Sequence, residues 1–214
     1  MEEGTPSREY LGILAERRMA LARELDAALD GSTEFVWELG SGHGHFLSAY
    51  AAAHPTVCCI GVDIVSDRIE RARRKRDRAR LTNLHFLRTE GRLFLETLPP
   101  TTRIRDAFIL FPDPWPKSRH HKHRIIQPSF LHQLASHATF DCRLIFRTDF
   151  GPYFEAARAT VTANDQWKLT DEPCLSRRKP CFRTAPQLTI LWSPAGGRHF
   201  HRPATPPKKT LKLN

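Results

Sequence analysis

Short apolar runs alternate with helix-like stretches along most of this chain, and this alternation constrains the fold more than any other feature. Runs rich in Val, Ile, Phe and Leu occur at residues 35–39, 57–63, 84–87, 106–111 and 142–149. Helix-like stretches lie between and after them, at residues 45–53, 66–80, 91–98, 127–138 and 152–164. Strands and helices that alternate over connections of this length predict a parallel sheet covered by helices on both faces. We therefore expect an α/β fold with a mostly parallel, doubly wound sheet.

The two ends of the chain differ from this pattern. Residues 7–30 have apolar positions at helical spacing and stop at Gly31, so they predict an N-terminal helix. The run at 187–192 fits an antiparallel edge strand, and residues 195–214 resemble a solvated basic tail, which either binds RNA or has no role. We expect an N-terminal helical segment at 1–33, one domain at 34–194 and the tail at 195–214, since 214 residues suffice for one core.

The charge balance concerns the partners of the chain. Lys and Arg number 33 against 23 Asp and Glu, which gives a formal net charge of +10 and a sequence pI of about 9.8. Such an excess favours polyanionic partners, most often nucleic acid. The alternative is a basic protein whose charge only keeps it in solution, and composition alone leaves both interpretations open.

The cysteines and the N-terminus indicate the compartment. Five cysteines, at positions 58, 59, 142, 174 and 181, form no CxxC pair and no regular spacing. This predicts free thiols in a reducing compartment, with neither a disulfide framework nor a metal site. The first residues are acidic and polar, unlike a signal peptide, and no apolar run reaches the ~20 residues of a membrane span. We expect a cytoplasmic protein that is not bound to a membrane.

A glycine-rich turn follows the first predicted strand. Gly40, Gly42 and Gly44 alternate there, and the second strand ends in Asp63, 23 residues after Gly40. Glycines let a backbone turn tightly and approach a ligand closely, and an acid at this distance can accept hydrogen bonds from both hydroxyls of a ribose. Taken alone, such a turn is often only a tight connection. Together, the strand, the turn, the helix and the acid favour a nucleoside cofactor.

The residue before the glycines indicates which nucleoside. The chain has neither the GxGxxG spacing after this strand nor a GxxxxGK[ST] loop, and Glu38 would repel a pyrophosphate. A cationic ligand without phosphate, such as S-adenosylmethionine, suits this loop better. The stretch ELGSGHG resembles the first motif of class I methyltransferases. In that class the position of Glu90, after the third strand, often contacts the adenine region; alternatively, Glu90 only begins the helix at 91–98.

The fourth strand leads into the unusual stretch FPDPWPKSRHHKHR. Prolines at 112, 114 and 116 fix φ and would hold Asp113 rigidly at the carboxyl end of the strand. Trp115 offers a face on which a base can stack, for about 1–3 kcal/mol. A strip suited to phosphates follows, made of Lys117, Arg119, His120, His121, Lys122, His123 and Arg124. The alternative is a proline-rich turn with a buried tryptophan.

The whole stretch FPDPWPKSRHHKHRIIQPSFL resembles the signature of bacterial tRNA (guanine-N7-)-methyltransferases, and it stands in order with ELGSGHG, GVD and RTDF. The resemblance covers roughly residues 34–165. It implies a Rossmann-like class I methyltransferase fold. It also implies an enzyme that transfers a methyl group from S-adenosylmethionine to N7 of a guanine in the variable loop of tRNA, forming 7-methylguanosine.

The resemblance also implies roles for single residues. Glu38, Asp63, Glu90 and Asp113 match the acids that contact the cofactor, together with the glycines at 40, 42 and 44. Asp113 is the position that the family regards as the active-site residue. Lys117 and Asp149 match substrate positions, and we add Trp115, Arg119 and His120 to the expected substrate contacts. The family motif Thr-x-Phe/Tyr-Glu has its counterpart in Pro180-Cys181-Phe182-Arg183, which keeps the aromatic residue but lacks the threonine and the glutamate.

Two other functions stay open at this point. The D-P-W-P stretch also resembles the loop of amino-group methyltransferases that act on adenine, cytosine or protein glutamine. The missing threonine and glutamate would suit an RNA-binding protein that kept the fold without catalysis. For the guanine reaction, either Asp113 or Asp149 would accept hydrogen bonds from the base, with Asp113 favoured by its position. The sequence does not distinguish a monomer from a homodimer.

Overall fold

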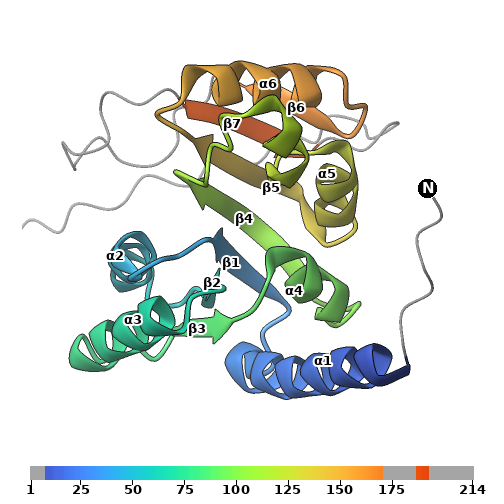
Figure 1. Cartoon of the computed structure of the whole chain (residues 1–214). Helices are drawn as coiled ribbons and strands as arrows, with labels where there is room; N and C mark the ends of the chain where they lie inside the picture. The colour runs from blue at the N-terminus through green and yellow to red at the C-terminus, as the bar shows by residue number, and fades with distance from the viewer. Residues whose placement is uncertain (1–7, 171–186, 193–214) are drawn as a thin grey trace, which may run out of the picture.

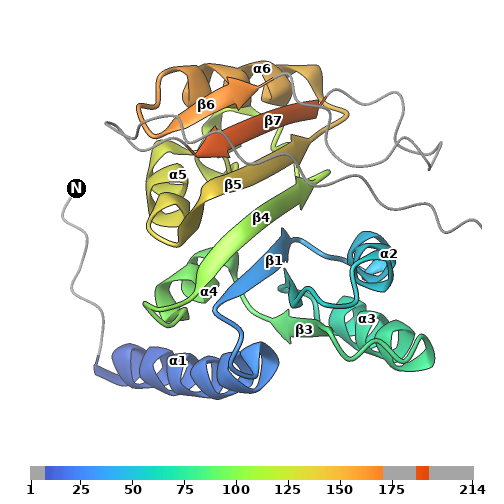
Figure 2. The same cartoon turned by 180° about the vertical axis from the view of Figure 1, so that it is seen from behind.

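The computed structural model describes residues 8–170 and 187–192. Seven strands form one sheet in the order β3-β2-β1-β4-β5-β7-β6 (Figures 1 and 2). Their bounds are β1 Glu34–Leu39, β2 Cys59–Asp63, β3 Leu84–Arg88, β4 Arg103–Leu110, β5 Ala138–Arg147, β6 Trp167–Thr170 and β7 Gln187–Trp192. The first five strands pair in parallel, and β7 is antiparallel to both β5 and β6. This is the expected mostly parallel α/β fold with an antiparallel strand.

Helices cover the sheet in two layers. Their bounds are α1 Arg8–Leu29, α2 His45–Ala53, α3 Ser66–Arg78, α4 Gly91–Thr97, α5 Pro128–Ala135 and α6 Gly151–Thr162, and a 3₁₀ helix, η1, spans Ser118–His123. One buried cluster joins α1, α4, α5 and α6 to the sheet, and a smaller cluster lies under α2 and α3. Alternation in β1 produces both clusters, since Phe35 and Trp37 belong to the first and Val36 to the second.

Most predicted elements are confirmed, with corrections at the strands. Strand β4 begins at Arg103 and β5 at Ala138, both earlier than the apolar runs indicated. The run at 187–192 is antiparallel as predicted, but it is not the edge of the sheet. The unpredicted strand β6 pairs with its outer side and forms the edge. Strand β6 has only four residues, of which Trp167 alone is buried, so its apolar pattern is too short to recognise.

The order of the strands fixes where a ligand can bind. Strands β1 and β4 are neighbours in the sheet but lie on the two sides of the reversal of strand order. At such a switch point the loops after neighbouring strands diverge and leave a crevice beyond the carboxyl ends. The register places Leu39 beside Ile109, and Leu110 beside Arg147. The loops that follow β1, β4 and β5 therefore start from the same edge of the sheet.

None of the helices in the described part of the chain combines the length and the apolar character that a membrane crossing requires.

Candidate active site

The turn after β1 uses most of its backbone N–H groups internally. The N–H groups of Gly40 and Ser41 both donate to the carbonyl oxygen of Val62, at 2.9 Å each. The N–H of Gly42 donates to Asp63 Oδ2 at 3.0 Å, and that of Gly44 to the Ser41 carbonyl at 2.9 Å. A phosphate-binding loop needs N–H groups that point freely at the ligand. This turn is therefore built for a ligand that does not present a phosphate to it.

The three glycines of the turn serve different purposes. All three have positive φ, but a Cβ at Gly40 or Gly42 would meet no atom within 4 Å. At Gly44 it would lie 2.5 Å from Phe86 Cζ and 2.9 Å from Ala72 Cβ. Gly44 thus lets the turn pack closely on β3 and α3, whereas Gly40 and Gly42 border open space.

Glu38 is a buried carboxyl group with an unused hydrogen-bonding oxygen. It is 3% exposed, and among the described residues its Oε2 has no hydrogen-bond partner. Burial raises its pKa well above the usual value, a backbone hydrogen bond from Leu47 in the first turn of α2 lowers it, and the charge of Asp63 raises it further. A buried acceptor without a partner is costly. Glu38 is therefore suited to accept a hydrogen bond from a cationic group.

Asp63 binds the turn and keeps acceptor capacity. It is 5% exposed, and besides the Gly42 bond its Oδ1 accepts from the N–H of Val65 at 2.9 Å. Arg68 Nη1 lies 3.7 Å from Oδ2. A carboxylate offers about four lone-pair sites, so two neutral donors leave room for further donors such as ribose hydroxyls. The structure thus gives Asp63 a structural role in the turn that the sequence did not indicate.

Glu90 lies in a pocket at the end of β3. It is the N-cap residue of α4 but makes no side-chain capping hydrogen bond, so the interpretation that it only begins the helix gains no support. The pocket has a volume of about 340 Å³. Its other lining residues come from α1, from the ends of β2 and β3 and from α4: Arg17, Ala20, Leu21, Glu24, Ile64, Arg88, Thr89 and Leu93. Ile64 is 63% exposed and directly follows Asp63, which gives the pocket an apolar wall beside the acid.

The loop that carries Asp113 has a strained backbone. Phe111 and Trp115, which flank the D-P stretch, have φ values of 54° and 44°. Such left-handed conformations are uncommon for residues with bulky side chains and cluster at functional sites. The N–H of Phe111 donates to the carbonyl oxygen of Arg147, which ties the loop to the end of β5. Asp113 itself is exposed.

Arg124 has a different position from the rest of the basic strip. It is 5% exposed, its Nε donates to the Pro114 carbonyl at 2.9 Å, and its Nη2 donates to the Trp115 carbonyl at 3.4 Å. Its guanidinium lies 4.8 Å from the centre of the Tyr153 ring, and the Tyr153 hydroxyl accepts from the N–H groups of Ile125 and Ile126. The sequence predicts Arg124 among the phosphate contacts. In the structure its buried side chain instead holds the Asp113 loop through its hydrogen bonds to the two backbone carbonyls.

The rest of the strip comprises Lys117 and the helix η1, and its side chains are exposed or, at His120 and His121, half-buried. Lys117 and Arg119 are exposed, and Arg119 Nε contacts His120 Nε2 at 3.2 Å. The half-buried Trp115 ring lies 5.1 Å from the His123 ring and 5.8 Å from the His120 ring, measured between centroids. Trp115 is thus part of an aromatic cluster at the surface and is not buried in a turn.

The predicted acids lie along one edge of the sheet, formed by the carboxyl ends of β1 to β5 and the residues that follow them, which we call the rim. Glu90 follows β3, Asp63 ends β2, and Asp113 follows β4. Asp149 is exposed and follows β5 after the fully buried Thr148. In the sheet only β1 lies between β2, which ends in Asp63, and β4, which Asp113 follows, and neighbouring strands are about 4.8 Å apart. The replaced motif at 180–183 lies outside the described residues.

Two parts of the Glu90 pocket were not predicted from the sequence: the residues that α1 contributes and the apolar wall formed by Ile64. The position of Ile64, next to an acid that ends a strand, was a usable signal, whereas the packing of α1 against β3 and α4 has none in the sequence. Within residues 8–170 and 187–192, no group of three or more His, Cys, Asp or Glu side chains is placed to hold a metal ion.

Comparisons with known proteins agree on a class of enzyme. A family model described as "Putative methyltransferase" matches residues 32–197. A tRNA (guanine-N(7)-)-methyltransferase of Syntrophotalea carbinolica is 31% identical over 68% of this chain and 63% of its own length. One of Caulobacter vibrioides is 33% identical over 64% of this chain and 61% of its own length. The chain thus spans about three fifths of the length of these curated relatives.

Solved structures share the fold. An rRNA methylase from Streptococcus thermophilus superposes with a TM-score of 0.53 at 12% identity, covering 89% of this chain and 99% of the other. The protein titled TrmN from Thermus thermophilus has a TM-score of 0.54 at 17% identity, covering 82% of this chain and 48% of the other. At such low identity the likeness concerns the fold alone.

Proposed function

Because the chain belongs to the methyltransferase family whose model matches residues 32–197, we propose that it methylates N7 of a guanine in the variable loop of tRNA, with S-adenosylmethionine as the methyl donor. The observation that carries the proposal is the rim at the switch point between β1 and β4. It combines a buried carboxyl group, one oxygen of which has no partner among the described residues, with an exposed carboxylate on a strained loop. The names of the relatives supply the choice of substrate.

The residues present fit S-adenosylmethionine. Glu38 would accept a hydrogen bond from the ammonium group, and the turn offers few free N–H groups that would favour a phosphate ligand instead. Asp63 would accept the ribose hydroxyls, and the pocket of Ile64 and Glu90 would hold the adenine ring. When bound, this cofactor supplies an electrophilic methyl group on sulfur. A guanine bound at the rim would lie between that methyl group, which N7 would face, and Asp113 at the opposite edge of the base.

The reaction requires little acid–base catalysis from the protein. Guanine N7 already has an in-plane lone pair, so no proton needs to be removed before attack. Catalysis can depend on holding N7 in line with the breaking bond at near-attack distance. The Asp113 carboxylate would accept hydrogen bonds from N1–H and the 2-amino group of guanine, which adenine does not offer together. The same negative charge would stabilise the positive charge that develops on the methylated ring.

The exposed part of the strip would bind the RNA. Lys117, Arg119 and His120 would contact phosphates, and Trp115 would offer a surface for stacking beside the target base. Asp149, which follows the neighbouring strand, would contact the base or its ribose from the other side of the crevice. These contacts would position a guanine from a folded RNA, as expected for RNA recognition by shape plus one accessible base.

The product of the reaction tests this proposal. Unmodified tRNA is incubated with the protein and S-adenosylmethionine, digested to nucleosides and analysed by mass spectrometry. We expect 7-methylguanosine, and no product from a tRNA whose variable-loop guanine is replaced by adenine. N6-methyladenosine or N4-methylcytidine would instead indicate an amino-group methyltransferase, and binding of tRNA without any product would indicate a non-catalytic protein.

Asp113 and Asp149 can be separated by matched substitutions. Both residues are exposed, so neither Asp113→Ala nor Asp149→Ala should affect folding. We expect Asp113→Ala to lower kcat/KM by about 10²–10³, as expected for loss of a group that stabilises charge in the transition state. Asp149→Ala should mainly raise KM for tRNA. Turnover of Asp113→Ala at the unmodified rate would refute the role of Asp113.

A further inference from the structure

A second concentration of positive charge lies on α3, outside the strip at residues 117–123. The helix has seven basic residues and three acidic ones in its 13 positions. Arg74 and Lys75 are three and four positions after Arg71, and Arg78 is four and three positions after them, so all four share one face. The opposite face contains Ile69 and Ala72, both buried against the sheet. One side of α3 is thus fixed to the core, and the other presents a row of cations.

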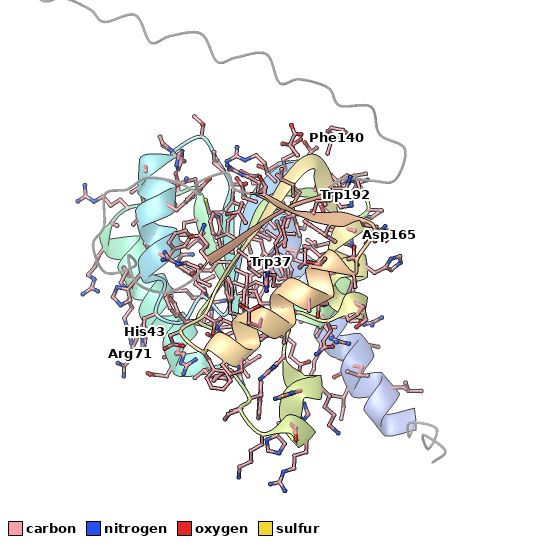
Figure 3. All side chains as sticks on the ribbon, turned by 90° about the horizontal axis from the view of Figure 1, so that it is seen from above. Trp37, His43, Arg71, Phe140, Asp165 and Trp192 are labelled. Carbon is pink, nitrogen blue, oxygen red and sulfur yellow. The ribbon has the colours of Figure 1, made fainter. Side chains whose placement is uncertain are left out.

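This row borders a groove next to the glycine turn. Besides Asp77, the groove is lined by basic or imidazole side chains, namely His43, His45, Arg71, Arg74, Lys75 and Arg78, and it has a volume of about 580 Å³. We call this the α3 groove. His43 and Arg71 lie together at one edge of the molecule, although one comes from the turn after β1 and the other from α3 (Figure 3). The turn and the helix therefore form one surface.

The cations of the α3 groove are only partly neutralised within the protein. Arg71 pairs with Asp67, and Asp77 is in contact with Arg76. Arg74 and Arg78 form no ion pair with any residue of the described chain. Lys75 Nζ donates to the His43 carbonyl at 2.9 Å, and burial together with the charge of Arg78 lowers the pKa of Lys75. Like charges this close repel each other, and a bound anion would offset that repulsion.

We propose that the α3 groove binds backbone phosphates of the RNA substrate, as a second contact area separate from the strip at 117–123. This inference rests on the proposed function, because it assumes that the substrate is an RNA. From Arg71 to Arg78 the helix rises about 10 Å, a length over which a nucleic-acid strand presents about three phosphates at roughly 3.4 Å of helix axis each. The two areas lie on the segments that follow β2 and β4, so an RNA bound to both would extend across the rim.

The chemistry of α3 favours RNA over an anionic membrane. A helix that lies on a membrane inserts large apolar side chains next to its basic residues. The large apolar side chain of α3 is Ile69, which is buried in the core at 2% exposure. The cationic face has arginine, lysine and histidine neighbours and no large apolar residue, which suits electrostatic contact with phosphates.

Salt dependence of tRNA binding tests the proposal. The double variant Arg74→Ala/Arg78→Ala is compared with the wild type and with a control of equal charge change, Arg158→Ala/Lys168→Ala, on the exposed surface of α6 and β6. Affinity for unmodified tRNA is measured between 50 and 300 mM salt, with thermal unfolding as a check on folding. Each lost phosphate contact should reduce the slope of log K against log salt by about 0.9. We therefore expect the slope to fall by roughly 1.8 in the first variant and to stay unchanged in the control.

A variant that removes a negative charge from the groove distinguishes a change in tRNA binding from damage to the fold. Asp77→Asn removes the one carboxylate of the groove and leaves Arg76 without its partner, so it should strengthen tRNA binding and steepen the salt slope. The proposal is wrong if both groove variants match the control, or if Arg74→Ala/Arg78→Ala loses binding to phosphatidylserine vesicles while its tRNA affinity is unchanged. Absence of methyl transfer would refute the proposed function, whereas these affinities do not depend on turnover.

Discussion

At the scale of single residues, the rim contains two buried carboxyl groups. Glu38 and Asp63 are both nearly inaccessible, yet they differ in their partners. Asp63 receives two backbone N–H groups, whereas one oxygen of Glu38 receives none among the described residues. Ionisable groups with strongly shifted pKa values cluster at functional sites. We therefore infer that Glu38 serves binding at the expense of stability.

Glu38→Gln should raise the stability of the free protein and lower its affinity for the cofactor. The folded pKa of Glu38 lies well above 4.5, so the fold is most stable with this group protonated, and that stability is lost as pH rises from about 4.5 through the raised pKa. The glutamine variant stays neutral and should unfold at a higher temperature than the wild type at pH 8. The difference should shrink toward pH 4, as thermal unfolding at several pH values can show.

The same variant should bind S-adenosylmethionine less tightly. Glutamine keeps an oxygen acceptor but loses the negative charge; because a hydrogen bond to a charged group contributes roughly 1.5–3 kcal/mol and a neutral one about 1 kcal/mol, we expect the affinity to fall by up to about tenfold. Calorimetric titration measures this, with Glu34→Gln at the exposed start of the same strand as the control. Equal affinities of Glu38→Gln and Glu34→Gln would show that Glu38 does not contact the cofactor.

At the scale of elements, the Asp113 loop is held by a buried arginine and not by its prolines alone. Arg124→Ala removes two hydrogen bonds to backbone carbonyls and the contact with the Tyr153 ring. We expect a loss of about 2–3 kcal/mol of unfolding free energy and a lower kcat, because the loop no longer fixes Asp113. Urea unfolding and methyl-transfer assays measure the two effects.

The exposed Arg119 is the matched control for this prediction. Arg119→Ala should change the unfolding free energy by no more than about 0.5 kcal/mol and should weaken tRNA binding instead. If Arg124→Ala and Arg119→Ala had the same stability and the same tRNA affinity, the division between an anchoring arginine and a phosphate-binding arginine would be wrong.

The glycine turn allows a second comparison between elements. Gly40→Ala and Gly44→Ala both force a Cβ into a left-handed conformation, which costs about 1–2 kcal/mol each. Only at Gly44 would the Cβ also collide with Phe86 and Ala72. Overpacking adds about 1–3 kcal/mol, so Gly44→Ala should be the less stable variant by that amount in urea unfolding. Equal losses would show that Phe86 moves aside without cost.

At the scale of the whole molecule, much of the architecture could be predicted because each buried strand forms its own apolar run. The limits arise where a local pattern is too short or where distant segments meet. Strand β6 has four residues, and the 3₁₀ helix η1 follows three prolines, so neither has a recognisable period. The anchoring role of Arg124 depends on Tyr153, which is 29 positions further on in a different helix.

The candidate site, too, could be predicted from the sequence only in part. The rim acids were predictable, since they stand at the ends of strands whose direction follows from the α/β pattern. The pocket wall from α1 was not predictable, because it depends on how the N-terminal helix packs against β3 and α4. Within the proposed function, the rim would bind the cofactor and the two basic surfaces would bind the RNA.

A crystal structure of the chain with bound S-adenosylhomocysteine tests this account most directly. We predict the amino group of the ligand beside Glu38, its ribose at Asp63, its adenine between Ile64 and Glu90, and its sulfur facing Asp113 across the space that a guanine would occupy. A ligand bound away from the end of β1, or an Asp113 carboxylate that points away from the sulfur, would contradict the account.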